Sequence, residues 1–379
     1  MTSQGDLLYT EEEEAVRSAV RSLLADHCDP AAVLARTESE QPHDRELWKA
    51  LADGMGLAGL LVPEDRGGQG ASHREAAVVL EELGRAVAPV PYLTSAVIAT
   101  ETLLACAGDA AAELLAALAS GRTVGALAVP FATAPEAAPE AAPEAAHPRV
   151  RFDRGALHGE VRGVADAAAA DVLLVPADGG LFAVDTGRDG VTVTPQTSLD
   201  RTRPLAVVTL DAAPARLLAE GAEADAAIRL GLRSGAGLLA SEQLGLAEWC
   251  LTETVRYTKE RHQFNRPVGS FQALKHRLAR LWLDVVNTRA VARHAADALA
   301  TGSDEPNLAT ALAQAHAAPV AVRAAEEAVQ LHGGIGMTWE HPVHLYLKRA
   351  KADSIALGTA GRHRENLADL IDLPAPATP

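Results

Sequence analysis

Aromatic residues are scarce in this chain, at 3% of its 379 residues, although 48% of the residues are hydrophobic. Much of the core must therefore be packed from small aliphatic side chains, chiefly alanine, on closely spaced elements. A chain of this length can bury a sizeable core, and we expect it to form more than one domain.

Cysteine and basic charge are also in short supply. Cys28, Cys106 and Cys250 are far apart and form no C-x-x-C pair, which excludes a disulfide framework and a cysteine zinc site. The formal net charge of −16 excludes a surface built for nucleic acid, which needs clustered lysine and arginine. Any site for an anionic ligand must depend on locally placed basic residues.

Long apolar runs are missing as well. The N-terminal stretch MTSQGDLLYTEEEE lacks the basic and apolar regions of a secretory signal. No run reaches the length of about 20 apolar residues that a membrane-spanning helix needs. The sequence therefore predicts no membrane partner and a cytoplasmic location.

The periodicity of apolar residues divides the chain into three parts. Residues 1–122 and 221–379 carry apolar residues at three- and four-residue steps, which predicts helices. Residues 123–220 carry short apolar runs separated by turn residues, which predicts a small antiparallel β-domain. We expect an α+β fold, mostly α, with an N-terminal helical domain, a middle β-domain and a C-terminal four-helix bundle.

Residues 131–148 form a segment rich in proline, alanine and glutamate inside the β-domain. The sequence PEAA begins at Pro135 and again at Pro139 and Pro143. A proline at every fourth position denies the segment helical hydrogen bonds, so we predict an extended spacer that is dispensable for folding.

A helical pattern ends within residues 256–276, which read RYTKERHQFNRPVGSFQALKH. Pro267 disfavours helical geometry in the residue before it. Arg261 and Phe264 are therefore presented at a helix end, where a guanidinium can bind phosphate and a phenyl ring can contact a flat group. An ordinary exposed helix end with salt bridges is the alternative interpretation of these residues alone.

Two motifs resemble signatures of the flavin-dependent acyl-CoA dehydrogenases. Arg261 to Val268, followed by Phe271-Gln272, resembles R-x-x-F-G-x-P-I…F-Q, and residues 328–337 (AVQLHGGIGM) resemble the second signature. The loop VPEDRGGQG at residues 62–70 resembles V-P-E-x-x-G-G-x-G of the same family. The resemblance extends over nearly the whole chain and is weakest between about residues 130 and 220.

The resemblance implies FAD as the cofactor and a particular set of residues around it. In the family, residues matching Arg261 and Phe264 contact FAD that a neighbouring subunit mainly holds. Residues matching Gln330, Gly333 and Gly334 approach its pyrophosphate, since paired glycines let backbone come close to a ligand. The same resemblance assigns Gln263, Gln272 and Thr359 to the cofactor site.

The segments that contact the flavin ring in the family differ here. Residues 127–131 (LAVPF) lead into the proline-rich segment, and residues 163–166 (GVAD) stand in place of a segment that contains tryptophan. The usual contacts to the flavin ring cannot therefore be carried over to this chain.

The resemblance also implies a carboxylate that removes the α-proton of an acyl thioester. The usual position of this base falls on Leu357, and the position used by other members falls on Gly235; neither side chain can ionise. Glu242 and Asp353 are nearby acids, but each is better explained as a solvated or salt-bridged helix residue. No arrangement of histidines suggests a metal site.

Three functions remain open at this stage. The first is α,β-desaturation of an acyl thioester, on CoA or a carrier protein, with an unusual or partner-supplied base. The second is a partner subunit of a heteromeric dehydrogenase, as residues 344–349 (HLYLKR) resemble actinobacterial steroid-type members with mixed assemblies. The third is flavin monooxygenase chemistry. The resemblance further implies an electron-transfer flavoprotein or other acceptor, a dimer or tetramer with FAD near the subunit interface, and an oxidoreductase role in lipid or secondary metabolism.

Overall fold

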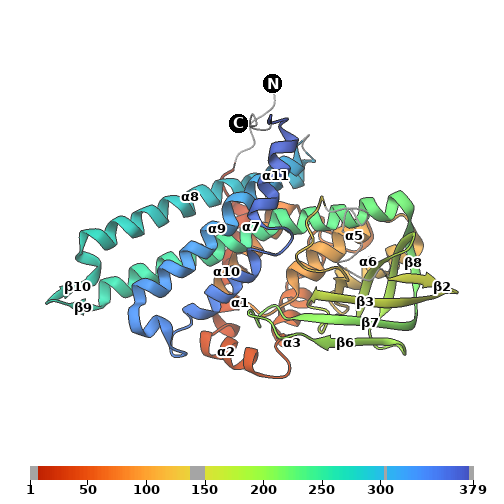
Figure 1. Ribbon diagram of the computed structural model, residues 1–379, viewed down its shortest axis with the longest axis horizontal. Coiled ribbons are helices and arrows are strands. Elements are labelled where there is room, and N and C mark those ends of the chain that lie inside the picture. Colours follow the sequence, from red (N-terminus) through yellow and green to blue (C-terminus); the bar gives the residue numbers. More distant parts are fainter. Residues whose placement is uncertain (1–6, 137–149, 303–304, 375–379) are drawn as a thin grey trace, which may run out of the picture.

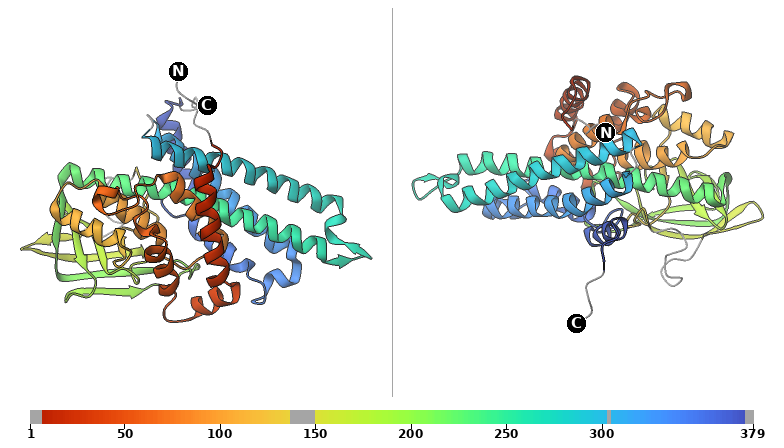
Figure 2. Two further views of the ribbon diagram at one scale, coloured as in Figure 1. Left: turned by 180° about the vertical axis from the view of Figure 1, so that it is seen from behind. Right: turned by 90° about the horizontal axis from the view of Figure 1, so that it is seen from above.

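The structure is a computed structural model that describes residues 7–136, 150–302 and 305–374. Helices predominate, and the strands between residues 125 and 220 gather at one end of an elongated molecule (Figure 1). The N-terminal helices lie against both the strands and the long C-terminal helices (Figure 2). Among the described helices, none is long and apolar enough to cross a membrane.

The N-terminal region begins with a capped helix. The Glu13 N–H donates to the Thr10 hydroxyl, and the Thr10 N–H donates to the Glu13 carboxylate, which satisfies free donors of the first turn. The helices of this region are α1 (Glu11–His27), α2 (Pro30–Glu38), α3 (Arg45–Lys49), η1 (Ala50–Gly54), η2 (Leu57–Gly59), η3 (Glu64–Arg66), α4 (His73–Ala86), η4 (Tyr92–Ala99), α5 (Thr100–Leu104) and α6 (Asp109–Ala119).

Two four-stranded sheets form the middle region, with the strand orders β1-β4-β5-β8 and β2-β3-β7-β6. The β1–β4 pair is parallel, whereas the sequence predicted antiparallel pairing throughout. Between these two strands the chain passes through β2 and β3 of the other sheet, and this long crossover lets β4 return in the direction of β1. The strands are β1 (Gly125–Leu127), β2 (Arg151–Asp153), β3 (Ala156–Ala165), β4 (Val172–Ala177), β5 (Gly180–Asp185), β6 (Val191–Pro195), β7 (Leu205–Pro214) and β8 (Arg216–Glu220).

The C-terminal region is organised along the 40-residue helix α7 (Gly221–Glu260), which runs from the sheets to the far end of the molecule (Figure 1). A hairpin of β9 (His262–Gln263) and β10 (Arg266–Pro267) closes that end. The other elements are η5 (Val268–Ser270), α8 (Gln272–Thr301), α9 (Pro306–His332), η6 (Gly333–Met337), α10 (Val343–Asp353) and α11 (Ala360–Leu370), of which α11 was not predicted.

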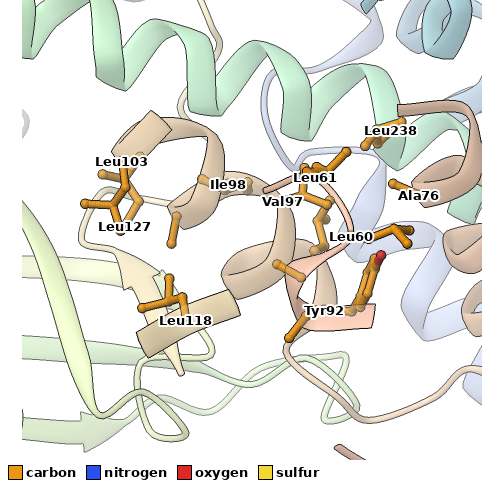
Figure 3. Close-up of a cluster of buried hydrophobic side chains, with 14 of the residues drawn as sticks. Leu60, Leu61, Ala76, Tyr92, Val97, Ile98, Leu103, Leu118, Leu127 and Leu238 are labelled. Atoms are coloured by element: carbon orange, nitrogen blue, oxygen red, sulfur yellow. The ribbon is translucent and has the colours of Figure 1, made fainter. Parts of the chain in front are cut away.

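Small residues set the distance between α4 and α7. A Cβ on Gly245 would lie 1.9 Å from the Glu81 carbonyl oxygen, and one on Gly84 would lie 2.2 Å from the Glu242 carbonyl oxygen. Only glycine permits so close an approach. One buried cluster joins the N-terminal helices to β1 and α7, with Leu60, Tyr92, Leu118, Leu127 and Leu238 among its members (Figure 3).

The predicted spacer is described only as far as Glu136, and its first residues differ from the expectation. Ala134 and Pro135 are buried, and the Asn366 side chain donates to the Glu136 carboxylate (2.6 Å). The Leu357 N–H also donates to the Phe131 carbonyl (2.7 Å). Residues 131–136 thus pack against the body because they supply apolar surface beside Leu357, and the remaining repeat lies outside the described residues.

Candidate functional site

The hairpin after α7 presents the first motif to solvent. Phe264 and Asn265 both have positive φ, 51° and 59°, as a two-residue turn between twisted strands requires. Asparagine tolerates this conformation well, and the turn leaves the Phe264 side chain 86% exposed. Arg261 follows the last helical residue, and within the described part of the chain its exposed guanidinium has no ion-pair partner.

The second motif lies at the same end of the bundle. The His332 ring stacks on Tyr257 near the end of α7, with 4.5 Å between the ring centroids. A Cβ added to Gly333 or Gly334 would meet nothing within 4 Å, so both glycines offer open backbone. We call this region the hairpin end; it comprises the exposed residues Arg261, Gln263, Phe264, Gln272, Gln330, Gly333 and Gly334.

The two predicted base positions meet in the interior. A Cβ on Gly235 would lie 2.6 Å from Ile98 and 3.3 Å from the Leu357 side chain. Leu357 is buried, and the adjoining cavity, which Thr94, Ile98 and Leu357 help to line, has a volume of only about 10 Å³. This region, here called the base pocket, is lined mainly by apolar side chains.

Backbone groups beside the base pocket form hydrogen bonds to one another. The Phe131 N–H donates to the Gly163 carbonyl (2.8 Å), and the Phe131 carbonyl accepts from Leu357. These are the segments that contact the flavin ring in the resembling family, and here they bond to each other. A cavity of about 300 Å³ adjoins both segments, since Phe131 and Gly163 are among its lining residues, and the open hairpin end fits an approaching phosphate.

Glu242 and Asp353 belong to a buried network of ion pairs. Arg203 donates to Glu242 (2.5 Å) and to Asp353 (2.9 Å), and Arg349 donates to Glu242 (2.6 Å) and to Asp200 (2.7 Å). The sequence singled out the two acids but missed both arginines and Asp200. The available signal was weak: two arginines and an aspartate within the short segment 200–203, and a third arginine, Arg349, in the helical segment 343–353.

The network shifts the pKa values of its two central acids in opposite directions. Burial raises the pKa of Glu242, but Arg203 and Arg349 outweigh burial and lower it to about 2. Burial and the charge of Glu242 raise the pKa of Asp353 well above its usual value, against the opposing effect of the same arginines. Glu242 is therefore a very weak base, and Asp353 favours its protonated form.

The predicted base positions lie far from most of the predicted cofactor residues. Gly235 touches the base pocket, and Arg261 follows 26 residues later, which corresponds to about 39 Å along a helix at 1.5 Å per residue. Thr359 is the exception among the predicted cofactor residues, since it lies beside the base pocket and its hydroxyl caps α11 by accepting from the Arg362 N–H. A single cofactor molecule can contact both a hairpin end and a base pocket only if these two regions come from different subunits.

Two histidines near the hairpin end approach an acid. His332, His341 and Glu253 offer ligand atoms within 4.8 Å of one another, and burial lowers the pKa of both histidines. Both Glu253 oxygens, however, accept from Arg256, and the Val343 N–H donates to His341 Nδ1. Arg256 thus competes for the Glu253 carboxylate, whereas His341 Nε2 still faces that carboxylate at 3.6 Å, and the expectation of no metal site stays a prediction.

The two helical regions match known protein families, and individual relatives match nearly the whole chain. Residues 10–122 match the acyl-CoA dehydrogenase N-terminal domain, and residues 226–371 match the acyl-CoA dehydrogenase C-terminal domain. The chain is 38% identical to acyl-CoA dehydrogenase IpdE2 of Mycolicibacterium smegmatis over 92% of this chain and 95% of that protein. The chain is also 37% identical to acyl-CoA dehydrogenase IpdE2 of Mycobacterium tuberculosis, over 90% of this chain and 91% of that protein.

A solved structure, the ChsE4-ChsE5 complex from Mycobacterium tuberculosis, has a similar chain. Its TM-score is 0.84 at 30% sequence identity, over 98% of this chain and all of that chain. The similarity therefore extends through the middle region, where the motifs of the present chain are weakest.

Proposed function

Since this chain belongs to the acyl-CoA dehydrogenase family, whose members depend on FAD, we propose that it is the partner subunit of a heteromeric acyl-CoA dehydrogenase. In this proposal the hairpin end completes an FAD site whose ring side and catalytic base belong to another, homologous chain. The present chain removes no proton itself.

The observation that carries the proposal is the contrast between the two base positions and the hairpin end. Gly235 and Leu357 contribute no carboxylate, and Ile98 fills the space between them. Arg261 remains exposed and without an ion-pair partner among the described residues. A guanidinium in this state can bind a diphosphate through paired charge-assisted hydrogen bonds.

The similar proteins support the class of substrate and the mixed assembly. The relatives carry the name acyl-CoA dehydrogenase, and the similar solved chain is part of a complex of two different proteins. We infer an acyl thioester as the substrate of the assembled enzyme and an electron-transfer flavoprotein or another acceptor as its oxidant. Electrons then leave through the FAD that both chains enclose.

The test is the visible absorption spectrum of the protein purified alone and purified together with a co-encoded homologue. We expect no flavin band in the lone protein and a stable flavin band in the mixed assembly. Stoichiometric flavin in the lone protein, retained through gel filtration, would contradict the proposal. The lone protein's melting curve serves as the control for correct folding.

A further inference from the structure

Two histidines and a glutamate from separate elements meet near the hairpin end. Glu253 lies on α7, His332 is the last residue of α9, and His341 stands just before α10. Each offers one ligand atom, and these three atoms lie within 4.8 Å of one another. Some point therefore lies within about 2.8 Å of all three, so small side-chain movements reach the bond lengths of about 2.0–2.2 Å that zinc requires.

His332 is held in the state that a metal ligand needs. Its Nδ1 lies 2.6 Å from the Ala328 carbonyl oxygen, which can only accept, so Nδ1 carries the proton and Nε2 has the free lone pair of the neutral ring. This Nε2 is buried without a hydrogen-bond partner among the described residues, and His332 is 2% exposed. An unsatisfied buried acceptor is costly, and a metal-ligating histidine usually donates its other N–H to a carbonyl or carboxylate in this way.

The His341 ring lies beside that of His332, with 4.2 Å between the ring centroids, and its Nε2 faces Glu253 Oε1. His341 Nδ1 accepts from the Val343 N–H at 3.3 Å, so the neutral ring carries its proton on Nε2. Coordination through Nε2 moves this proton to Nδ1 and breaks the contact with Val343. The cost is small, because that contact is longer than the usual range of about 2.7–3.2 Å.

Glu253 keeps capacity for a further partner although Arg256 donates to both of its oxygens. A carboxylate offers about four acceptor positions, and Arg256 takes two of them. The Arg256 side chain is 54% exposed and also donates to Glu260 (2.6 Å). Within this group two carboxylates face one guanidinium, so the local charge is negative and attracts a cation.

We propose that Glu253, His332 and His341 bind a divalent transition metal ion, with zinc as the best match. Two imidazoles and one carboxylate form a common ligand set for zinc, and three protein ligands leave the fourth tetrahedral position to water or another ligand. The ion joins α7 to the end of α9 and to the segment before α10. This proposal replaces the expectation of no metal site, which rested on the sequence before the fold had joined the three residues. The site depends on neither FAD nor a second chain.

The test is calorimetric titration of the lone, full-length protein, free of any affinity tag, with Zn²⁺. We expect one ion per chain in the wild type. His332→Phe keeps a ring against Tyr257 but removes the ligand atom, so affinity should fall about 100-fold or more. The matched control is His276→Phe, at an exposed histidine of α8, which should bind as the wild type does. Zn²⁺ binding that His332→Phe leaves unchanged would show adventitious surface binding and overturn the proposal.

Two further measurements test the ligand set. Co²⁺ bound to the wild type should give the visible bands of a four-coordinate ion, and His341→Phe and Glu253→Gln should each change them. Arg256→Gln removes the competing guanidinium and should tighten Zn²⁺ binding several-fold. Identical cobalt spectra for the wild type and His341→Phe, or weaker Zn²⁺ binding by Arg256→Gln, would contradict the proposed ligands. Melting curves without metal check that each variant folds, and Zn²⁺ should raise the melting temperature of the wild type but not of His332→Phe.

Discussion

The hairpin end and the base pocket differ in their exposure to solvent and in the residues that they present. At the hairpin end, Arg261 and Phe264 are exposed and Gly333 offers open backbone. At the base pocket, Leu357 and Ile98 fill the space, and Phe131 bonds to Gly163. The hairpin end is exposed, whereas Gly235 and Leu357 are buried among apolar side chains.

The proposed function rests on this difference, since the two regions are built from different parts of the chain. The contacts at the hairpin end depend on a local turn and a helix end, which a few residues specify. The base pocket depends on side chains from α7, η4 and the segment after α10, which lie far apart in the sequence. Five predictions test this comparison, from the largest expected effect to the smallest.

The buried network beside the base pocket should contribute most to stability. Glu242→Ala leaves parts of two buried arginines uncompensated, so we expect a loss of about 3–5 kcal/mol in the free energy of unfolding. Glu260→Ala, at an exposed ion pair on the same helix, should cost about 1 kcal/mol or less. Urea unfolding of the two variants measures both effects.

The same network predicts a pH dependence. The folded-state pKa of Glu242 is lowered from 4.5 to about 2, so its contribution is present above pH 4.5 and is lost as pH falls toward 2. The stability difference between the wild type and Glu242→Ala should shrink over that window. A difference that stays constant down to pH 2 would contradict the ionised pair.

A carboxylate placed in the base pocket should destabilise the lone chain. Leu357→Glu buries an acid among apolar side chains without a cationic partner, and we expect a loss of about 2–4 kcal/mol in stability. The loss should be smaller below pH 4, where the glutamate is protonated in both states. Unfolding at two pH values measures it, and unchanged stability at neutral pH would show that the pocket is more open than its volume suggests.

The hairpin end should affect the assembly but not the lone chain. Arg261→Ala should weaken FAD retention in the mixed assembly by about 1.5–3 kcal/mol, the contribution of a charge-assisted hydrogen bond. Its effect on the stability of the lone protein should be within about 0.5 kcal/mol, because the side chain is exposed. Arg229→Ala, an exposed arginine nearer the other end of α7, is the matched control and should retain FAD fully.

The turn of the hairpin predicts the smallest effect. Asn265 has a φ of 59°, which alanine adopts less readily, so Asn265→Ala should cost about 1 kcal/mol. Asn265→Gly should cost nothing, since glycine is unstrained there. Thermal unfolding separates the two variants, and equal melting temperatures would argue that the hairpin does not unfold with the rest of the chain.

The sequence predicted the three-part fold because its signals are local. Helical periodicity in residues 221–260 and the break of the helical pattern before Pro267 can be read directly from neighbouring residues. The network of Arg203, Glu242 and Arg349 could not be predicted, because its members come from three distant segments that only the tertiary fold joins. The packing of Pro135 and Glu136 was missed for the same reason, since their partners lie near the C-terminal end of the chain.

The measurement that tests the central claim most directly is anaerobic bleaching of flavin absorbance by acyl-CoA. The lone chain, supplied with FAD, and the mixed assembly are each exposed to short, medium and steroid acyl-CoAs. The account predicts bleaching only in the mixed assembly, because Leu357 and Gly235 provide no base, and a positioned base contributes about 10²–10⁴-fold in rate. Rapid bleaching of the lone chain by any of these substrates would contradict the account, and Glu242 and Asp353 would then be the first residues to replace.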